Sequence, residues 1–305
     1  MADPQSDPST LSGRLRRKLW NFVHGNFRRF EALGIHVTPN HFYQPIPDTR
    51  TLKDELWGEP SALPGIRLNE ERQLGLLREL HAWSKEYDEL LEKGSGWYFN
   101  GNGFFDGLDA AIYYALIRQR KPKRIVEIGA GYSTYVAGLA VQANAREGNP
   151  CEITAIEPYP RAELSGAMPG NPRILVSTVN DVSLDQFSAL QTNDILFIDS
   201  SHVARIGSDV NREILEIVPR LHTGVLVHFH DIYLPYEYPR QWVMNEFRFW
   251  NEQYMLQAFL SGNQEFEVLW SGYAMHRKHL SALKDAVASH QKHEIPPGSF
   301  WIRRK

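Results

Sequence analysis

Histidine and acidic side chains follow two short apolar runs in the second half of the chain. Residues 199–202 (DSSH) come directly after the apolar run 195–198, and residues 228–231 (HFHD) close a second apolar run. Imidazole has an ordinary pKa near ~6.5 and can take the proton of a hydroxyl group, and histidines together with carboxylates can bind a divalent metal. The residue types therefore predict one of two kinds of site. The candidates for acid–base catalysis are His202, His230 and Asp231, and those for a metal are Asp199, His228, His230 and Asp231.

Alternation along the second run indicates which of its side chains act together. His228 and His230 are two residues apart, so a strand would point both to one face, with Asp231 just past the strand end. His202 has a plainer alternative interpretation, that of a histidine that only supports its loop.

A glycine-containing turn at residues 126–134 (VEIGAGYST) is the other feature that could bind a ligand. The pattern predicts a short strand, a turn and a helix capped by Ser133. Gly129 and Gly131 would let the backbone approach a ligand closely. Thr134 stands where a dinucleotide fingerprint has its third glycine, so a nucleoside is favoured over a pyrophosphate.

A carboxylate follows the next apolar run downstream. Glu157 comes directly after the apolar residues 153–156 and before Pro158, which predicts that it lies at the carboxyl end of a buried strand. A carboxylate in that place can accept hydrogen bonds from both hydroxyl groups of a ribose. Together with the glycine turn, it indicates a nucleoside site.

These motifs resemble the class I S-adenosylmethionine-dependent methyltransferases over roughly the last two-thirds of the chain. Glu127 with the GxG turn and Glu157 carry the likeness to the superfamily. FIDSSH at 197–202 and HFHD at 228–231 are similar to its small-molecule branch, which is related to cephalosporin hydroxylase and macrocin O-methyltransferase. The resemblance implies S-adenosylmethionine as cofactor and an α/β fold, namely a doubly wound, Rossmann-like seven-stranded sheet with an antiparallel last strand.

The resemblance also implies which residues contact the cofactor. They are Glu127, Gly129, Gly131, Tyr132, Ser133, Glu157, Asp181 and Asp199. Asp181 would contact the adenine amine, although capping a helix that starts near residue 184 explains it equally well. Metal-dependent relatives carry an acidic pair where this chain has His230 and Asp231. Because magnesium prefers oxygen ligands, this difference favours a softer metal or none.

The order of predicted elements agrees with this fold. Helices at 69–91 and 104–120 lead into strands that alternate with helices, and each strand is continuously apolar, as in a parallel sheet covered on both faces. The predicted strands are 124–129, 152–157, 174–177, 194–199, 224–230, 266–274 and 299–303. The helices among them are 133–145, 161–168, 184–190, 208–221 and 251–260.

The domain boundary is expected near Lys93. Residues 94–305 would form the methyltransferase domain, and residues 1–93 a helical extension with a substrate-side strap at 34–50, whose histidines either line the pocket or are structural. Within the extension, residues 13–30 mix basic and large apolar side chains without any acid. They predict an amphipathic helix that packs on the domain or on a second subunit, with an anionic membrane surface as the alternative.

Composition narrows the class of protein and its partners. Of 305 residues, 42% are hydrophobic and 23% charged, and 33 basic against 36 acidic residues give a net charge of −3. These values are typical of a soluble globular protein and argue against nucleic acid as a partner. The single cysteine excludes an internal disulfide, and residues 1–10 do not resemble a secretory signal. No run reaches the ~18 apolar residues of a membrane span, so a cytoplasmic protein without stable membrane insertion is expected.

The favoured function is transfer of a methyl group from S-adenosylmethionine to a small-molecule acceptor, at oxygen, with a histidine base or metal assistance. A second hypothesis is a metal-dependent oxygenase or hydrolase that uses Asp199, His228, His230 and Asp231 on a methyltransferase fold. A third is a noncatalytic binding module that keeps the nucleoside pocket. A homo-oligomer formed through residues 13–30 is a further expectation.

Overall fold

The computed structural model describes residues 11–38, 40–41, 43–94, 96, 98–99, 101–292 and 295–305. The chain divides into two compact units, one made of Met1–Gly58 with Arg240–Phe249 and the other of Glu59–Pro239 with Trp250–Lys305. Pro39 and Phe42 of the expected strap lie outside the described residues, as do residues 1–10. Among the helices that the structure describes, none is long and apolar enough to span a membrane.

Short helices make up the smaller unit. They are α1 (Leu11–Gly25), α2 (Phe27–Ala32), η1 (Thr49–Thr51), α3 (Glu55–Gly58) and α9 (Arg240–Met244). Asn26 separates α1 from α2 within the predicted amphipathic segment. Leu11, Leu15, Leu19 and Phe22 are exposed along one side of α1. The predicted segment 13–30 is therefore helical but divided into two helices, and the role of its apolar stripe stays a prediction.

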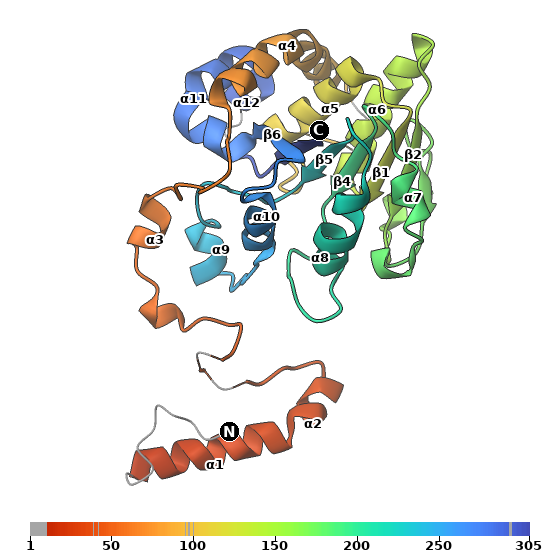
Figure 1. The fold of residues 1–305 in the computed structure, drawn as a ribbon. Coiled ribbons are helices and arrows are strands. Elements are labelled where there is room, and N and C mark those ends of the chain that lie inside the picture. Colours follow the sequence, from red (N-terminus) through yellow and green to blue (C-terminus); the bar gives the residue numbers. More distant parts are fainter. Residues whose placement is uncertain are drawn as a thin grey trace. The chain divides into compact units, whose positions relative to one another are not determined.

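The larger unit is built on a seven-stranded sheet, and Figure 1 labels most of its strands. Its strands are β1 (Arg124–Ile128), β2 (Glu152–Ile156), β3 (Arg173–Leu175), β4 (Ile195–Ile198), β5 (Leu226–Phe229), β6 (Phe266–Ser271) and β7 (Phe300–Arg304). Their order is β3-β2-β1-β4-β5-β7-β6, with β1 to β5 parallel and β7 antiparallel to both β5 and β6. The predicted Rossmann-like sheet with an antiparallel last strand is confirmed. In such a sheet, ligands bind at the carboxyl ends of the parallel strands.

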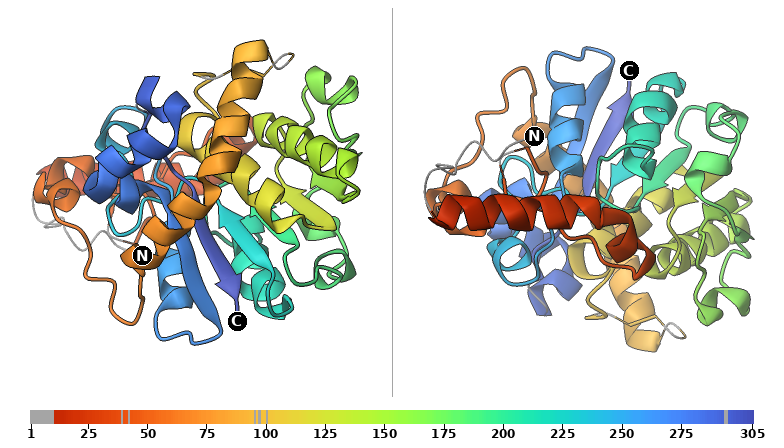
Figure 2. Two further views of the ribbon diagram at one scale, coloured as in Figure 1. Left: turned by 90° about the horizontal axis from the view of Figure 1, so that it is seen from above. Right: turned by 90° about the horizontal axis from the view of Figure 1, so that it is seen from below.

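Helices cover both faces of this sheet, as its continuously apolar strands require (Figures 1 and 2). One face carries α4 (Glu70–Lys93), α5 (Gly107–Arg120), α6 (Tyr132–Arg146), α11 (Gly272–Ala286) and α12 (Ala288–Lys292). The other carries α7 (Asp185–Ser188), α8 (Asp209–Arg212) and α10 (Glu252–Leu260). Successive strand residues belong to opposite cores: Ile125 and Ile195 pack in the first, and Val126 and Leu196 in the second.

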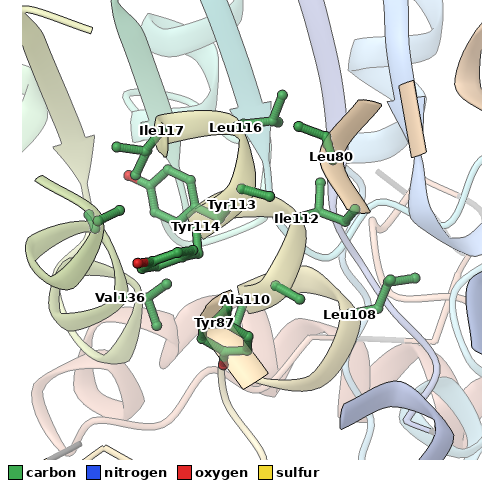
Figure 3. Packing of buried hydrophobic residues seen from close by; sticks show 14 of the residues in the cluster. Leu80, Tyr87, Leu108, Ala110, Ile112, Tyr113, Tyr114, Leu116, Ile117 and Val136 are labelled. Atoms are coloured by element: carbon green, nitrogen blue, oxygen red, sulfur yellow. The ribbon is translucent and has the colours of Figure 1, made fainter. Parts of the chain in front are cut away.

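Helix α5 is buried on every side, which explains why its sequence shows little separation of apolar and polar faces. All residues from Gly107 to Arg118 are buried. Tyr113 stacks on Phe197 of the sheet, with ring centroids 4.7 Å apart. Tyr114 points instead to α4, where its hydroxyl donates to Glu86 at 2.5 Å. Figure 3 shows the side chains of α5 packed among those of its neighbours. The helix is thus held between the sheet and α4.

The predicted helix at 208–221 is replaced by three shorter parts: α8, a π-helical segment η4 (Glu213–Ile217) and a 3₁₀ turn η5 (Val218–Arg220). Pro219 lacks the N–H group that a regular helix needs, so the α-helical pattern cannot continue through it. Glu213, at the start of the π-helical segment, is fully buried. The predictions at 161–168 and 184–190 likewise become shorter elements, η2 (Ala162–Ser165) and α7. Most other predicted elements differ only at their ends.

Candidate active site

The turn between β1 and α6 brings two backbone segments close together at Gly129. Its φ is +90°, in the left-handed region that favours glycine. A Cβ atom at this position would lie 2.1 Å from the carbonyl oxygen of Asp199. Backbone hydrogen bonds of 2.9 Å, from Gly129 N to Ile156 O and from Asp199 N to Ile128 O, hold this packing. The close approach that requires glycine at this position is therefore made by the loop after β4, and contact of Gly129 with the cofactor stays a prediction.

Of the two glycines in this turn, Gly131 is the one that faces open space. Among the described residues, no atom beyond its immediate chain neighbours lies within 4 Å of the position that its Cβ atom would take. Its N–H group donates to Thr134 Oγ1 at 3.1 Å, within the first turn of α6. Because this helix begins at Tyr132, the predicted cap at Ser133 is wrong, and Ser133 is buried inside the first turn. The space beside Gly131 is open, and a side chain at this position would extend into it.

Glu157 follows β2 and is half-buried. Its Oε2 accepts a hydrogen bond from Ala130 N at 3.2 Å, and its Oε1 accepts one from Tyr159 N at 2.8 Å. The carboxylate therefore ties the glycine turn to the loop after β2. A carboxylate can accept about four hydrogen bonds, so both oxygens keep capacity for the hydroxyl groups of a ligand.

Glu127, in β1, is fully buried. The hydroxyl of Tyr113 donates to its Oε1 at 3.0 Å. Burial raises the pKa of Glu127 to about 7, although hydrogen bonds from Thr134 and Tyr113 oppose the shift. The side chain therefore changes between a protonated and an ionised form near neutral pH.

Asp181 ends the 3₁₀ turn η3 (Val179–Asp181) and is exposed. Its Oδ2 accepts a hydrogen bond from Thr178 Oγ1 at 2.6 Å. The residue that caps α7 is Leu184, so the alternative in which Asp181 caps this helix is wrong. Contact with an adenine stays a prediction for Asp181.

Four side chains converge at the carboxyl ends of β4 and β5, which are neighbours in the sheet. His202 Nε2 lies 3.3 Å from Asp199 Oδ1 and 3.7 Å from Asp231 Oδ2. His230 Nδ1 lies 3.6 Å from Oδ1 of each aspartate. One nitrogen of each imidazole thus faces the same two carboxylates. The parallel pairing of β4 with β5 brings these two loops together.

A buried carboxylate stands behind each of these histidines. Glu252 Oε2 lies 2.9 Å from His202 Nδ1, and Asp109 Oδ2 lies 3.8 Å from His230 Nε2. Asp109 accepts in turn from two backbone N–H groups that precede β7, at 2.7 and 3.1 Å. The sequence predicted neither carboxylate. Asp109 is the one acid in the apolar helix α5, and this unusual position could have indicated a functional role. Glu252 gave no such indication, because it lies in the first turn of a helix, where acids are common.

Pairing of opposite charges dominates the electrostatics of this cluster. Burial lowers the pKa values of His202 and His230, but the facing carboxylates more than offset it and raise both well above the ordinary value. Burial opposes ionisation of Asp199, yet the two histidines hold its pKa well below the usual range. Burial also keeps the pKa of Asp109 above its usual value, against the attraction of His230. The cluster is therefore built of imidazolium groups paired with ionised Asp199.

His228 stands apart from these four residues. Its ring stacks on Phe197, with centroids 4.0 Å apart, and its Nε2 lies 2.8 Å from Ser299 Oγ. Burial lowers the pKa of His228 well below its usual value, so the ring is neutral. The rings of His228 and His230 are 5.9 Å apart, as alternation along β5 predicts. The predicted metal-binding role of His228 does not follow from this arrangement.

The converging atoms match the ligands of a divalent transition metal. One ligand atom each of Asp199, His230 and Asp231 lies within 4.8 Å of the others. Imidazole nitrogen suits zinc or iron and carboxylate oxygen suits manganese, whereas magnesium prefers oxygen ligands alone. A carboxylate behind the second ring nitrogen is also common around metal-bound histidines. This donor set therefore fits a softer divalent metal better than magnesium.

Residues 126–232 match the family model described as "Methyltransferase domain". An uncharacterized protein of Archaeoglobus fulgidus is 34% identical over 174 residues, which are 53% of this chain and 77% of that protein. An SAH-bound methyltransferase from Podospora anserina is 16% identical with a TM-score of 0.40, over 75% of this chain and 87% of that one. An O-methyltransferase from Bacillus cereus in complex with SAH is 11% identical with a TM-score of 0.39, over 76% of this chain and 90% of that one. The matched segment 126–232 contains the glycine turn, Glu157 and the four converging residues.

Proposed function

The chain belongs to the methyltransferase-domain family matched by residues 126–232, and we propose that it transfers a methyl group from S-adenosylmethionine to an oxygen atom of a small-molecule acceptor. The observation that carries this proposal is the convergence of Asp199, His202, His230 and Asp231. They follow β4 and β5, which come directly after β1 in the strand order. The glycine turn and the groups able to take a proton therefore share one edge of the sheet.

The glycine turn supports binding of the cofactor. The open position at Gly131 leaves room for a ligand, and Glu157 keeps the capacity to accept hydrogen bonds from ribose hydroxyls. Glu127 would lie toward the amino-acid end of the cofactor. The remaining proposed contacts are Tyr132, Ser133, Asp181 and Asp199.

The four converging residues account for the acceptor half of the reaction. S-adenosylmethionine supplies an electrophilic methyl group, so the protein must align the acceptor and receive its proton. We assign that proton to His202 Nε2 or His230 Nδ1, each of which faces the same two carboxylates and can take a proton once its imidazolium ring has lost one. Asp199 and Asp231 would orient the hydroxyl group of the acceptor by accepting its hydrogen bond.

A metal at the same place is the second form of the proposal. Asp199, His230 and Asp231 would hold it, and it would polarise the acceptor oxygen and lower its pKa. His202 would then remain beside the two aspartates as the nearest imidazole.

The test is methyl transfer from radiolabelled S-adenosylmethionine to a panel of catechols, phenols and hydroxy acids by the full-length protein. We expect His202→Asn and Asp231→Asn each to lower turnover by about a hundredfold or more, because proton transfer by a positioned side chain contributes about 10²- to 10⁴-fold. Calorimetry should show that both variants still bind S-adenosylmethionine. His222→Asn, at an exposed histidine outside the cluster, is the matched control and should keep wild-type turnover.

Chelation separates the two forms. Loss of turnover with retained S-adenosylmethionine binding assigns the metal. Turnover that resists chelator and rises with pH, through a value above the ordinary pKa of imidazole, assigns a histidine base, since the carboxylates raise the pKa values of both rings. Wild-type turnover in His202→Asn and Asp231→Asn would contradict the proposed site. Tightly bound iron or zinc without methyl transfer to any acceptor would favour an oxygenase or a hydrolase instead.

A further inference from the structure

Glu252 is a fully buried carboxylate next to the four converging residues. It is the first residue of α10, and backbone hydrogen bonds fasten the start of this helix to the loop after β4. The N–H groups of Asn251 and Glu252 donate to the carbonyl oxygen of His202, at 3.1 and 3.2 Å. The side chain of Asn251 accepts from Ala204 N at 2.6 Å. The position of Glu252 relative to His202 is therefore fixed by the backbone.

The side chain of Glu252 selects one nitrogen of the imidazole. Its Oε2 lies 2.9 Å from His202 Nδ1. The imidazolium carries a hydrogen on each nitrogen, and when the ring is neutral, a carboxylate that accepts from Nδ1 keeps the remaining hydrogen there. Nε2 is then the nitrogen that faces Asp199 and Asp231. Trp250 packs against the same ring, with centroids 4.3 Å apart, and limits its rotation.

The burial of Glu252 is unfavourable for stability. Glu213, on the π-helical segment, is fully buried as well, and its pKa is raised well above the usual value by burial and by the charge of Glu252. In the described part of the chain, Oε1 of each of these two glutamates has no hydrogen-bond partner. Buried carboxylates that interact unfavourably and are incompletely hydrogen-bonded destabilise a fold. Their presence beside a candidate active site indicates a role other than stability.

We propose that Glu252 is a positioning residue, which accepts the Nδ1 hydrogen of His202 and thereby directs Nε2 to Asp199, Asp231 and the acceptor. The effect on turnover rests on the proposed function, whereas the hydrogen bond itself does not. Carboxylates of this kind fix the tautomer and the orientation of a functional histidine.

Nuclear magnetic resonance tests the hydrogen bond without any acceptor. In full-length protein labelled with ¹⁵N-histidine, the hydrogen on His202 Nδ1 is expected to give a far-downfield, slowly exchanging signal, assigned by its loss in His202→Asn. Glu252→Gln replaces an ionic acceptor by a weaker neutral one, so the signal should move upfield or disappear. Glu213→Gln is the matched control, because it neutralises the other buried carboxylate and leaves the acceptor of Nδ1 in place.

Kinetics test the consequence. Glu252→Gln is expected to lower kcat by about 10- to 100-fold, the usual effect of losing a carboxylate behind a functional histidine, with the KM for S-adenosylmethionine unchanged. Glu213→Gln should keep wild-type kcat. If Glu252→Gln does not fold, Glu252→Asp keeps the charge but shortens the reach, and it should lose the signal in the same way.

Two results would overturn the inference. One is a Glu252→Gln variant that keeps both the Nδ1 signal and wild-type kcat, and the other is a Glu213→Gln variant that loses both to the same extent. Absence of methyl transfer by the wild-type protein would count against the proposed function alone, because the Nδ1 signal would still decide the hydrogen bond.

Discussion

Replacing Glu127 by glutamine should change how the stability of the protein depends on pH. The pKa of Glu127 is raised from 4.5 to about 7 in the folded protein, chiefly by burial. Between these two values the folded protein holds a proton that the unfolded chain has lost. This favourable contribution is fully present below pH 4.5 and is lost as the pH rises through 7. Since one pKa unit corresponds to about 1.4 kcal/mol, the shift of 2.5 units amounts to roughly 3 kcal/mol.

The measurement is urea unfolding of the wild-type protein and Glu127→Gln at several pH values between 4.5 and 8. Glutamine still offers an oxygen to the hydroxyl of Tyr113 and does not titrate. All other groups titrate in both proteins, so their contributions cancel in the difference. We expect the wild-type protein to lose roughly 3 kcal/mol relative to the variant across this range. Glu152→Gln, at a side chain that is 85% exposed, is the control and should show no such dependence.

A difference between wild type and Glu127→Gln that stays constant with pH would refute this reasoning. It would mean that Glu127 titrates at its ordinary pKa, and hence that water or an ionic partner reaches its carboxylate in the absence of a ligand.

Two further predictions concern the glycine turn. Glu157→Gln should weaken binding of S-adenosylmethionine by about ten- to a hundredfold in calorimetry, because a hydrogen bond to a charged group contributes about 1.5 to 3 kcal/mol; unchanged affinity in the folded variant would remove Glu157 from the site. Gly131→Ala should keep the wild-type Tm and lose affinity for S-adenosylmethionine, whereas Gly129→Ala should lower the Tm, since its Cβ atom would lie 2.1 Å from a carbonyl oxygen. Equal effects of the two alanines on Tm would contradict this division of roles.

The sheet could be predicted because its strands are short, continuously apolar and separated by turn residues. Each of the seven predicted strands overlaps an observed strand, and their order follows from parallel pairing around β1. The segment 208–221 resisted prediction, because its apolar spacing is that of a helix while Pro219 forbids a regular one. The cap of α6 was misplaced for a related reason: Ser133 is a favourable capping residue, but the helix starts at Tyr132 with Gly131 before it.

Only those residues of the candidate site that directly follow a strand could be predicted from the sequence. Asp199 and the pair His230 and Asp231 follow adjacent strands, so the sequence could bring them to one edge. The carboxylates behind the histidines come from distant elements, Asp109 from α5 and Glu252 from α10, and no local pattern links them to the histidines. Such pairs depend on how helices dock on a sheet. Periodicity along the chain carries little information about that docking.

Backbone strain is concentrated where the site is formed. His202 and Asp231 have φ values of +60° and +56°, a region that residues other than glycine rarely adopt. Each residue in this conformation costs about 1 to 2 kcal/mol relative to an ordinary one, and glycine would remove that cost. Their side chains are, however, the ones that face each other, with Nε2 of His202 3.7 Å from Oδ2 of Asp231. Neither position can therefore be glycine without losing part of the cluster. The strained residues after the two strands and the buried carboxylate of Glu252 all lower stability at the same place. Selection for a reaction, rather than for the fold, would leave such a combination.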